Sequence, residues 1–179
     1  NKSKLSIVIA AKNEEQNINS LIDSLDELNY PKENFEVIIV DDNSTDHTAE
    51  LIQSRITGKN NFAFIRAHQK EMEGKKGALT EGIKKTKYDY LVITDADCKP
   101  KRNWLQFISG SLNYGYDFVF GVAPIQAGNT LVEKLSAFEN LRNTYLTIAA
   151  VGLNIPYSAA ARSFAFKKAS FERIGGYTK

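Results

Sequence analysis

The sequence predicts an α/β fold, a mainly parallel open sheet with helices on both faces. One observation is that short runs of apolar and β-branched residues, typical of buried parallel strands, recur along the chain. A second is that stretches with apolar residues at a period near 3.6, typical of amphipathic helices, separate these runs. A third is that polar clusters follow three of the runs, at the place where ligands bind in open α/β sheets.

Several segments are predicted as strands because they are apolar and are bounded by polar or turn-forming residues. The first run is nearly continuous in apolar character, so we expect it at the centre of the sheet. The strands are predicted at residues 5–10, 35–40, 62–65, 90–94, 118–122 and 164–166.

The helices are predicted from apolar spacing and from residues that start or stop helices. Asn13 is the expected N-cap of the first helix, which ends before Pro31, and Pro100 is the expected start of the fourth, with Phe107 on its inner face. The other helices are predicted near His47 after the polar cluster 41–46, after Gly74-Lys75-Lys76-Gly77, at residues 130–151 and at residues 170–174. The end of the long helix, residues 148–151, is apolar all round and predicts a partner surface.

Length and composition indicate one globular domain of 179 residues, with 42% hydrophobic and 25% charged residues. The net charge of +2 is too balanced for a general nucleic-acid binder, so no nucleic-acid partner is expected. A single cysteine, Cys98, predicts a cytosolic or cytosol-facing chain. No apolar run approaches the roughly 20 residues of a membrane span. The chain begins with Asn1 and stops just after Gly175-Gly176-Tyr177, so we expect it to be a piece of a longer protein.

Polar side chains follow the first, second and fourth predicted strands. They are Lys12-Asn13-Glu14, Asp41-Asp42 and Asp95-Ala96-Asp97. Because the carboxyl ends of parallel strands meet at one edge of a sheet, we expect the three clusters to converge on one site. The alternative for each cluster is helix capping, since Asp and Asn commonly end a strand and begin a helix.

Asp95 and Asp97 form the sharpest candidate site. In an extended segment alternate side chains share a face, so both carboxylates can reach one hard divalent cation, Mg²⁺ or Mn²⁺. Such a cation bridges protein carboxylates and a diphosphate. The alternative is a surface acid pair that caps the helix after Pro100.

Phosphate-binding loops of the common types are absent. Gly74-Lys75 lacks the earlier glycine and the following Ser or Thr of a P-loop, and no GxGxxG is present, which argues against a P-loop kinase or a Rossmann dehydrogenase. Lys75 and Lys76 at a helix start can still neutralise a phosphate, with a solvated lysine pair as the alternative.

Three further candidates are given structural roles. His47 and His68 have no second His or Cys at metal-ligand spacing, so surface or capping roles are expected. Cys98 is expected to be a packed residue and not a nucleophile.

In order and spacing, four segments resemble the inverting family 2 glycosyltransferases, and the resemblance covers nearly the whole chain. Lys12 stands where an aromatic residue is common in that family. The segments are Ser6-Ile-Val-Ile-Ala-Ala-Lys-Asn-Glu-Glu15, Val40-Asp-Asp-Asn-Ser-Thr-Asp46, Gly74-Lys-Lys-Gly-Ala-Leu-Thr-Glu-Gly82 and the DxD motif Asp95-Ala96-Asp97, with residues 163–177 similar to the stretch leading to the acceptor side.

The resemblance implies a GT-A fold and metal-assisted transfer of a sugar, with inversion, from a nucleoside diphosphate sugar to a glycan or lipid acceptor. It implies that Asp97 is the main metal ligand, that Asp95 contacts the sugar nucleotide and the metal, and that Asp42 and Glu14 seat the nucleoside. Lys75 would add positive charge at the diphosphate. The implied donor-binding residues are Ala11, Lys12, Glu14, Asp42, Lys75, Asp95 and Asp97.

The resemblance also implies an organisation and a setting. Residues 1–179 would form one GT-A domain, with a donor half at 1–100 and the start of an acceptor half at 101–179. The general base is expected beyond Lys179, so this stretch by itself is expected to be inactive. A cytoplasmic location, membrane attachment of the complete protein and a role in cell envelope polysaccharide follow as expectations.

Two other functions are weighed against this one. A nucleotidyltransferase would need a Gly-rich loop after the first strand, where the chain has Ala10-Ala11-Lys12-Asn13. A phospho-acceptor signalling domain would carry its acidic pair after the first strand, whereas Asp41-Asp42 follows the second. A non-catalytic module that binds nucleotide sugars remains as a further alternative.

Overall fold

A computed structural model describes residues 2–125, 128–155, 158 and 161–177 of the chain. Within these residues the strands form one six-stranded sheet in the order β3-β2-β1-β4-β6-β5. The strands are β1 (Leu5–Ala11), β2 (Phe35–Asp41), β3 (Phe62–Arg66), β4 (Tyr90–Ile93), β5 (Phe118–Phe120) and β6 (Phe164–Lys167). The helices are α1 (Ile18–Asp26), α2 (Thr48–Ile56), α3 (Gly74–Lys84), α4 (Trp104–Asn113), α5 (Leu131–Gly152) and α6 (Lys168–Arg173), with short 3₁₀ turns η1 (Lys32–Asn34) and η2 (Ala161–Ser163).

The sheet is mixed, with a parallel core. β3, β2, β1 and β4 are parallel neighbours, whereas β6 runs antiparallel to both β4 and β5. The prediction of a mainly parallel sheet with β1 at its centre is therefore confirmed, and β6 is the reversed strand. It enters the sheet between β4 and β5, although it follows both in the sequence.

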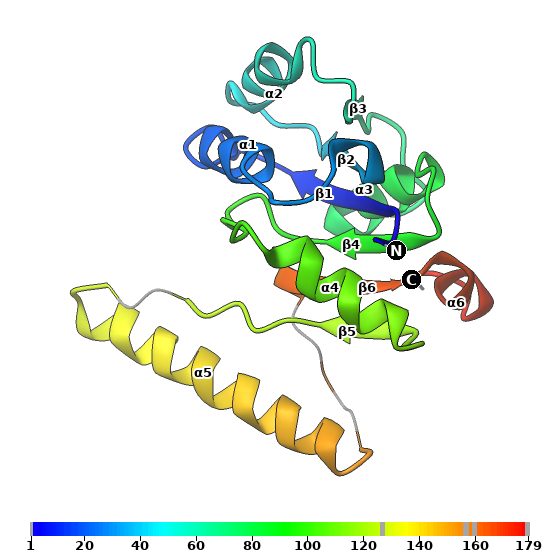
Figure 1. Cartoon of the computed structure of the whole chain (residues 1–179). Helices are drawn as coiled ribbons and strands as arrows, with labels where there is room; N and C mark the ends of the chain where they lie inside the picture. Colours follow the sequence, from blue (N-terminus) through cyan, green and yellow to red (C-terminus); the bar gives the residue numbers. More distant parts are fainter. Residues whose placement is uncertain (1, 126–127, 156–157, 159–160, 178–179) are drawn as a thin grey trace.

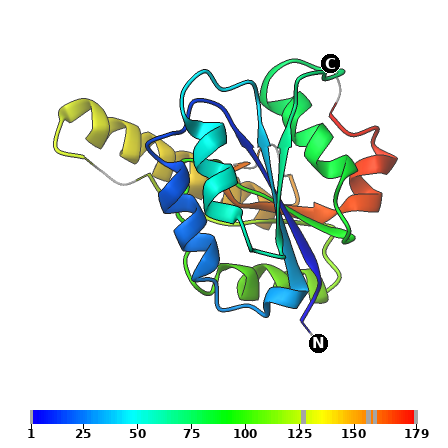
Figure 2. The ribbon, with the colours of Figure 1, turned by 90° about the horizontal axis from the view of Figure 1, so that it is seen from above.

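Helices cover both faces of the sheet, as Figure 2 shows in the view from above. On one face α1, α2 and α4 pack on apolar side chains that include Ile7, Ile9 and Val37. On the other face α3 and α6 pack on a second cluster that includes Val8, Ile38 and Phe166. Alternate residues of β1 thus serve opposite cores, which is why that strand reads as a continuous apolar run.

Two predicted helix starts are wrong. α1 begins at Ile18 with Asn17 as N-cap, because Asn13 adopts a left-handed conformation (φ 56°) and its side chain bonds to another loop. α4 begins at Trp104, four residues after Pro100, with Asn103 as N-cap.

The inner face of α4 also differs in one residue from the prediction. Leu105, Ile108 and Leu112 are buried, whereas Phe107 is 75% exposed. Phe107 lies on the side of α4 opposite these buried positions, so it points away from the sheet.

Helix α5 lies beyond β5, outside the layered body (Figure 1). It begins with a capping box in which Thr130 and Glu133 bond each other's backbone N–H groups. Ile148 and Val151, for which the sequence predicts a partner surface, are 44% and 41% exposed. Among the described residues, none of the helices combines the length and apolar character that crossing a bilayer requires.

Candidate functional site

The carboxyl ends of β2, β1 and β4 are adjacent and point the same way, so the three predicted polar clusters converge. They surround a pocket of about 180 Å³, called here the first pocket. All seven residues predicted to bind a donor line it, although their roles toward a ligand stay predictions. Its lining consists of Ala10, Ala11, Lys12, Glu14, Asp42, Lys75, Asp95, Ala96 and Asp97.

Hydrogen bonds connect the loops after β1 and β2 beside the first pocket. The side-chain oxygen of Asn13 accepts a hydrogen bond from the Thr45 backbone N–H (2.8 Å), and the Asn13 N–H donates to Ser44 Oγ (3.0 Å). The Glu14 N–H donates to Thr48 Oγ1 (2.7 Å). Asn tolerates the left-handed backbone conformation that this connection requires. The bonds fix the backbone that carries Lys12 and Glu14 into the pocket.

Asp42 is held by a buried ion pair that the sequence analysis missed. Its carboxylate accepts a hydrogen bond from Lys70 Nζ, and the side chains of Asp42 and Lys70 are only 5% and 10% exposed. Lys70 is distant in sequence and lies in no recognised motif, so no local signal marks it.

The capping alternative for Asp42 is wrong. The N-cap position of α2 is His47, and the carboxylate of Asp46, not that of Asp42, accepts from the N–H of the first helical residue, Thr48 (3.0 Å). Partial burial raises the pKa of Asp46, but hydrogen bonds from Thr48 and from the Glu15 backbone outweigh it and leave the pKa below its ordinary value. Asp42 and Asp46 therefore have different roles, Asp46 at the start of α2 and Asp42 at the pocket.

Asp95 is paired with Lys75, the lysine at the start of α3. α3 lies close to the sheet because Gly82 lacks a side chain: a Cβ there would lie 2.5 Å from Val8 Cγ1 and 2.9 Å from Val40 Cγ2. This close approach brings Lys75 to the first pocket. Lys76 is exposed and lies outside that lining.

Asp97 has a free carboxylate at the same pocket. It is exposed, and its contact is with the Cys98 thiol at 3.7 Å, with no ion pair among the described residues. Burial raises the pKa of Cys98, so the thiol stays protonated, as expected for a packed residue and not for a nucleophile.

The donor set at Asp95 and Asp97 fits a hard divalent cation. The described residues contain no group of three or more His, Cys, Asp and Glu side chains that could enclose a metal. Two carboxylates on an open pocket match the way Mg²⁺ and Mn²⁺ are bound through one or two protein carboxylates, with the remaining positions taken by phosphate oxygens and water.

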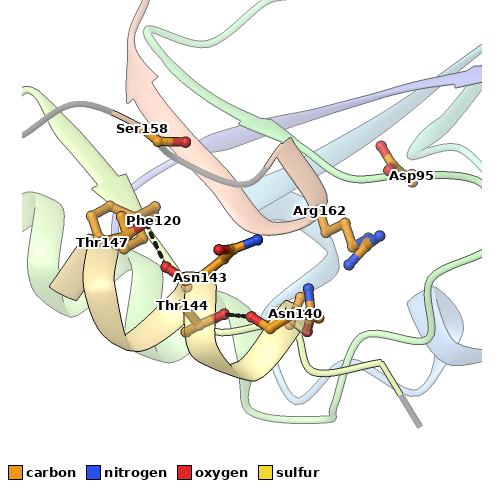
Figure 3. A pocket seen from close by; sticks show the side chains of 10 residues that line it. Asp95, Phe120, Asn140, Asn143, Thr144, Thr147, Ser158 and Arg162 are labelled. Carbon is orange, nitrogen blue, oxygen red and sulfur yellow. Dashed lines mark hydrogen bonds between the residues drawn. The ribbon is translucent and has the colours of Figure 1, made fainter. Parts of the chain in front are cut away.

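A larger pocket of about 340 Å³, called here the second pocket, adjoins the first and shares Asp95 with it. Figure 3 shows it between α5 and the end of the sheet, with Arg162 and Asp95 toward one end. Apart from Asp95, none of its residues belongs to a motif that marks a site in the sequence. Its lining consists of Asp95, Phe120, Gly121, Ala123, Asn140, Asn143, Thr144, Thr147, Ser158 and Arg162.

Comparisons with known proteins agree with this geometry. A family model described as Glycosyl transferase family 2 matches residues 6–175. The chain is 30% identical over 144 residues to the Haloferax volcanii protein named Glycosyltransferase AglE, covering 77% of this chain and 46% of that protein.

Two solved structures show the same fold. The mannosyltransferase PcManGT from Pyrobaculum calidifontis, in complex with GDP-Man and Mn²⁺, superposes with a TM-score of 0.76 at 20% identity, covering 99% of this chain and 48% of that one. Residues 1–349 of Staphylococcus aureus TarS in complex with UDP-GlcNAc give 0.69 at 19% identity, covering 98% and 48%. The chain thus spans about half the length of these relatives.

Proposed function

The chain belongs to glycosyl transferase family 2, and from this premise we propose that its first pocket binds a nucleoside diphosphate sugar for transfer to an acceptor by the complete protein. One observation carries the proposal: three adjacent parallel strand ends bring carboxylates and lysines together around one pocket. Mixed charge of this kind suits a ligand that has both a nucleoside and a diphosphate.

Each charged group then has a task. Asp42 and Glu14 seat the nucleoside by accepting hydrogen bonds from it, and Lys12 and Lys75 offer positive charge to the diphosphate. The N-terminus of α3 adds its own positive potential beside Lys75. Inversion and an acceptor hydroxyl as the attacking group follow from the family resemblance.

Asp95 and Asp97 would hold a divalent cation, Mg²⁺ or Mn²⁺. When bound, such a cation stabilises the leaving diphosphate as a Lewis acid. The carboxylates and the diphosphate are all negative, so their approach requires positive charge between them. The solved neighbour that contains GDP-Man also contains Mn²⁺, which supports this assignment.

The division of the chain into halves has support in the two pockets. The first pocket is lined by residues between 10 and 97, whereas the second is lined by Asp95 and residues between 120 and 162. We therefore propose residues 1–100 as the donor half and residues 101–179 as the start of the acceptor half. The free thiol of Cys98 supports a cytosolic or cytosol-facing location.

Calorimetry with UDP and GDP, with and without Mn²⁺, tests the donor site. We expect one of the two nucleotides to bind and to require Mn²⁺. Asp97→Asn should weaken this binding about tenfold or more, the loss in affinity expected when a charged ligand of the cation is removed. Asp89→Asn is the matched control, because Asp89 is exposed before β4 begins, at the opposite end of that strand. Binding of neither nucleotide, or equal affinity in Asp97→Asn, would contradict the donor site.

Release of UDP or GDP from a panel of nucleotide sugars by the complete protein tests the transfer activity. Binding without any release in the presence of candidate acceptors would favour the non-catalytic module instead.

A further inference from the structure

Helix α5 carries a row of polar side chains toward the second pocket, while its exposed surface holds large apolar side chains together with charged ones such as Lys134 and Arg142. Asn140, Asn143, Thr144 and Thr147 line the second pocket. Leu135, Phe138 and Tyr145 are 59%, 60% and 66% exposed. A surface helix that only completes a core buries its apolar side, so the inward row of amides and hydroxyls is not explained by packing.

The second pocket contains an arginine without an ion pair. Arg55, Arg66, Arg142 and Arg173 each pair with a carboxylate, whereas Arg102 and Arg162 pair with none among the described residues, and of these two only Arg162 lines the second pocket. Arg162 is half-buried at the pocket.

The other charged residue of the second pocket, Asp95, is already matched by Lys75. The guanidinium of Arg162 is therefore left as positive charge that a ligand can neutralise. Guanidinium groups suit phosphate and carboxylate groups, which they bind through two parallel hydrogen bonds.

The polar side chains of α5 that line the second pocket can form hydrogen bonds with the hydroxyls of a sugar. Asn143 makes no side-chain hydrogen bond within the described residues, so its amide can both donate and accept. Asn140 accepts from the Ile125 N–H (3.2 Å) and keeps its NH₂ group available. The Thr144 and Thr147 hydroxyls donate to the carbonyls of Asn140 and Asn143 within the helix, so toward the pocket they serve as acceptors (Figure 3).

We propose that the second pocket is the acceptor site and that Arg162 selects a saccharide acceptor bearing a negatively charged group, whose hydroxyls are read by Asn140 and Asn143. This rests on the proposed function, because Asp95 borders both pockets and a sugar donor in the first pocket would meet an acceptor in the second there.

Titrations followed by NMR, with Mg²⁺ and saturating UDP or GDP to occupy the first pocket, test this proposal. The probes are glucose 1-phosphate, glucuronic acid and uncharged methyl glucoside. We expect both charged probes to bind more tightly than methyl glucoside, and Arg162→Gln to remove this preference with a loss of about tenfold. Arg162→Lys keeps the charge and should keep part of the preference. Asn143→Ala should weaken all three probes alike, since it removes contacts to hydroxyls.

Arg142→Gln is the matched control, because Arg142 lies on α5 close to the pocket-lining residues but is absent from the lining and paired with Glu139. It should leave all affinities unchanged. The alternative ligand of Arg162 is the diphosphate of the donor, and calorimetry of nucleotide binding to Arg162→Gln tests this alternative. Equal loss of nucleotide affinity would assign Arg162 to the donor and overturn the proposal.

Equal binding of charged and uncharged probes to the unmodified protein would also overturn the proposal. The titrations are also repeated without nucleotide, so that failure of the donor site and failure of the acceptor pocket can be distinguished. Absence of UDP and GDP binding in the calorimetry would refute the donor site, while Arg162-dependent binding of glucose 1-phosphate in the absence of nucleotide would still support the anion-selective pocket.

Discussion

Replacing Asp42 by Asn should destabilise the fold as well as weaken nucleotide binding. The substitution leaves the ammonium of Lys70 without its carboxylate, and both side chains are at most 10% exposed. Removing one partner of a buried ion pair costs about 3 kcal/mol in free energy of unfolding. For a chain of 179 residues this corresponds to a decrease in Tm of roughly 6–12 °C.

Urea denaturation of four proteins measures this effect: the unmodified chain, Asp42→Asn, Lys70→Met and the double variant. The double variant removes both charges, so we expect its stability to lie within about 1 kcal/mol of the unmodified protein. Asp23→Asn breaks an exposed pair with Arg55 (58% and 41% exposed) and should cost at most about 1 kcal/mol.

Nucleotide binding to the double variant separates the two tasks of Asp42. If Asp42 contacts the nucleoside, the stable double variant should bind UDP or GDP about tenfold more weakly. A free energy of unfolding for Asp42→Asn within about 1 kcal/mol of that of the unmodified protein would refute this prediction, because the buried ion pair would then contribute little to stability.

Two further predictions concern packing and reactivity. Gly82→Ala should lower the free energy of unfolding, measured by urea denaturation, by about 1–3 kcal/mol, because the added methyl group meets Val8 and Val40. This loss should exceed the gain from the higher helix propensity of alanine. Unchanged or higher stability would show that α3 can move away from the sheet. Alkylation of Cys98 by iodoacetamide should reach its half-maximal rate at a higher pH in the folded protein than in urea, since burial raises the thiol pKa and less thiolate is present at any given pH; coincident profiles would contradict this.

The order of strands and helices and the edge that carries the site could be predicted from the sequence. The apolar run of β1 predicts burial on both faces, and the polar residues after β1, β2 and β4 mark the ends of three strands. Helix starts were less accurate. Asn13 has a residue type that suits both a cap and a left-handed loop, and the sequence does not say which partner it bonds.

The sequence by itself determined that the strands are buried and where polar groups follow them, because periodicity and residue type reflect the local environment of most side chains. Tertiary structure alone decided the partners: β6 pairs between β4 and β5, Lys70 meets Asp42, and α5 turns its polar row toward Arg162. Each of these joins segments far apart in the chain, and a local pattern shows that a side chain needs a partner without specifying which distant residue provides it.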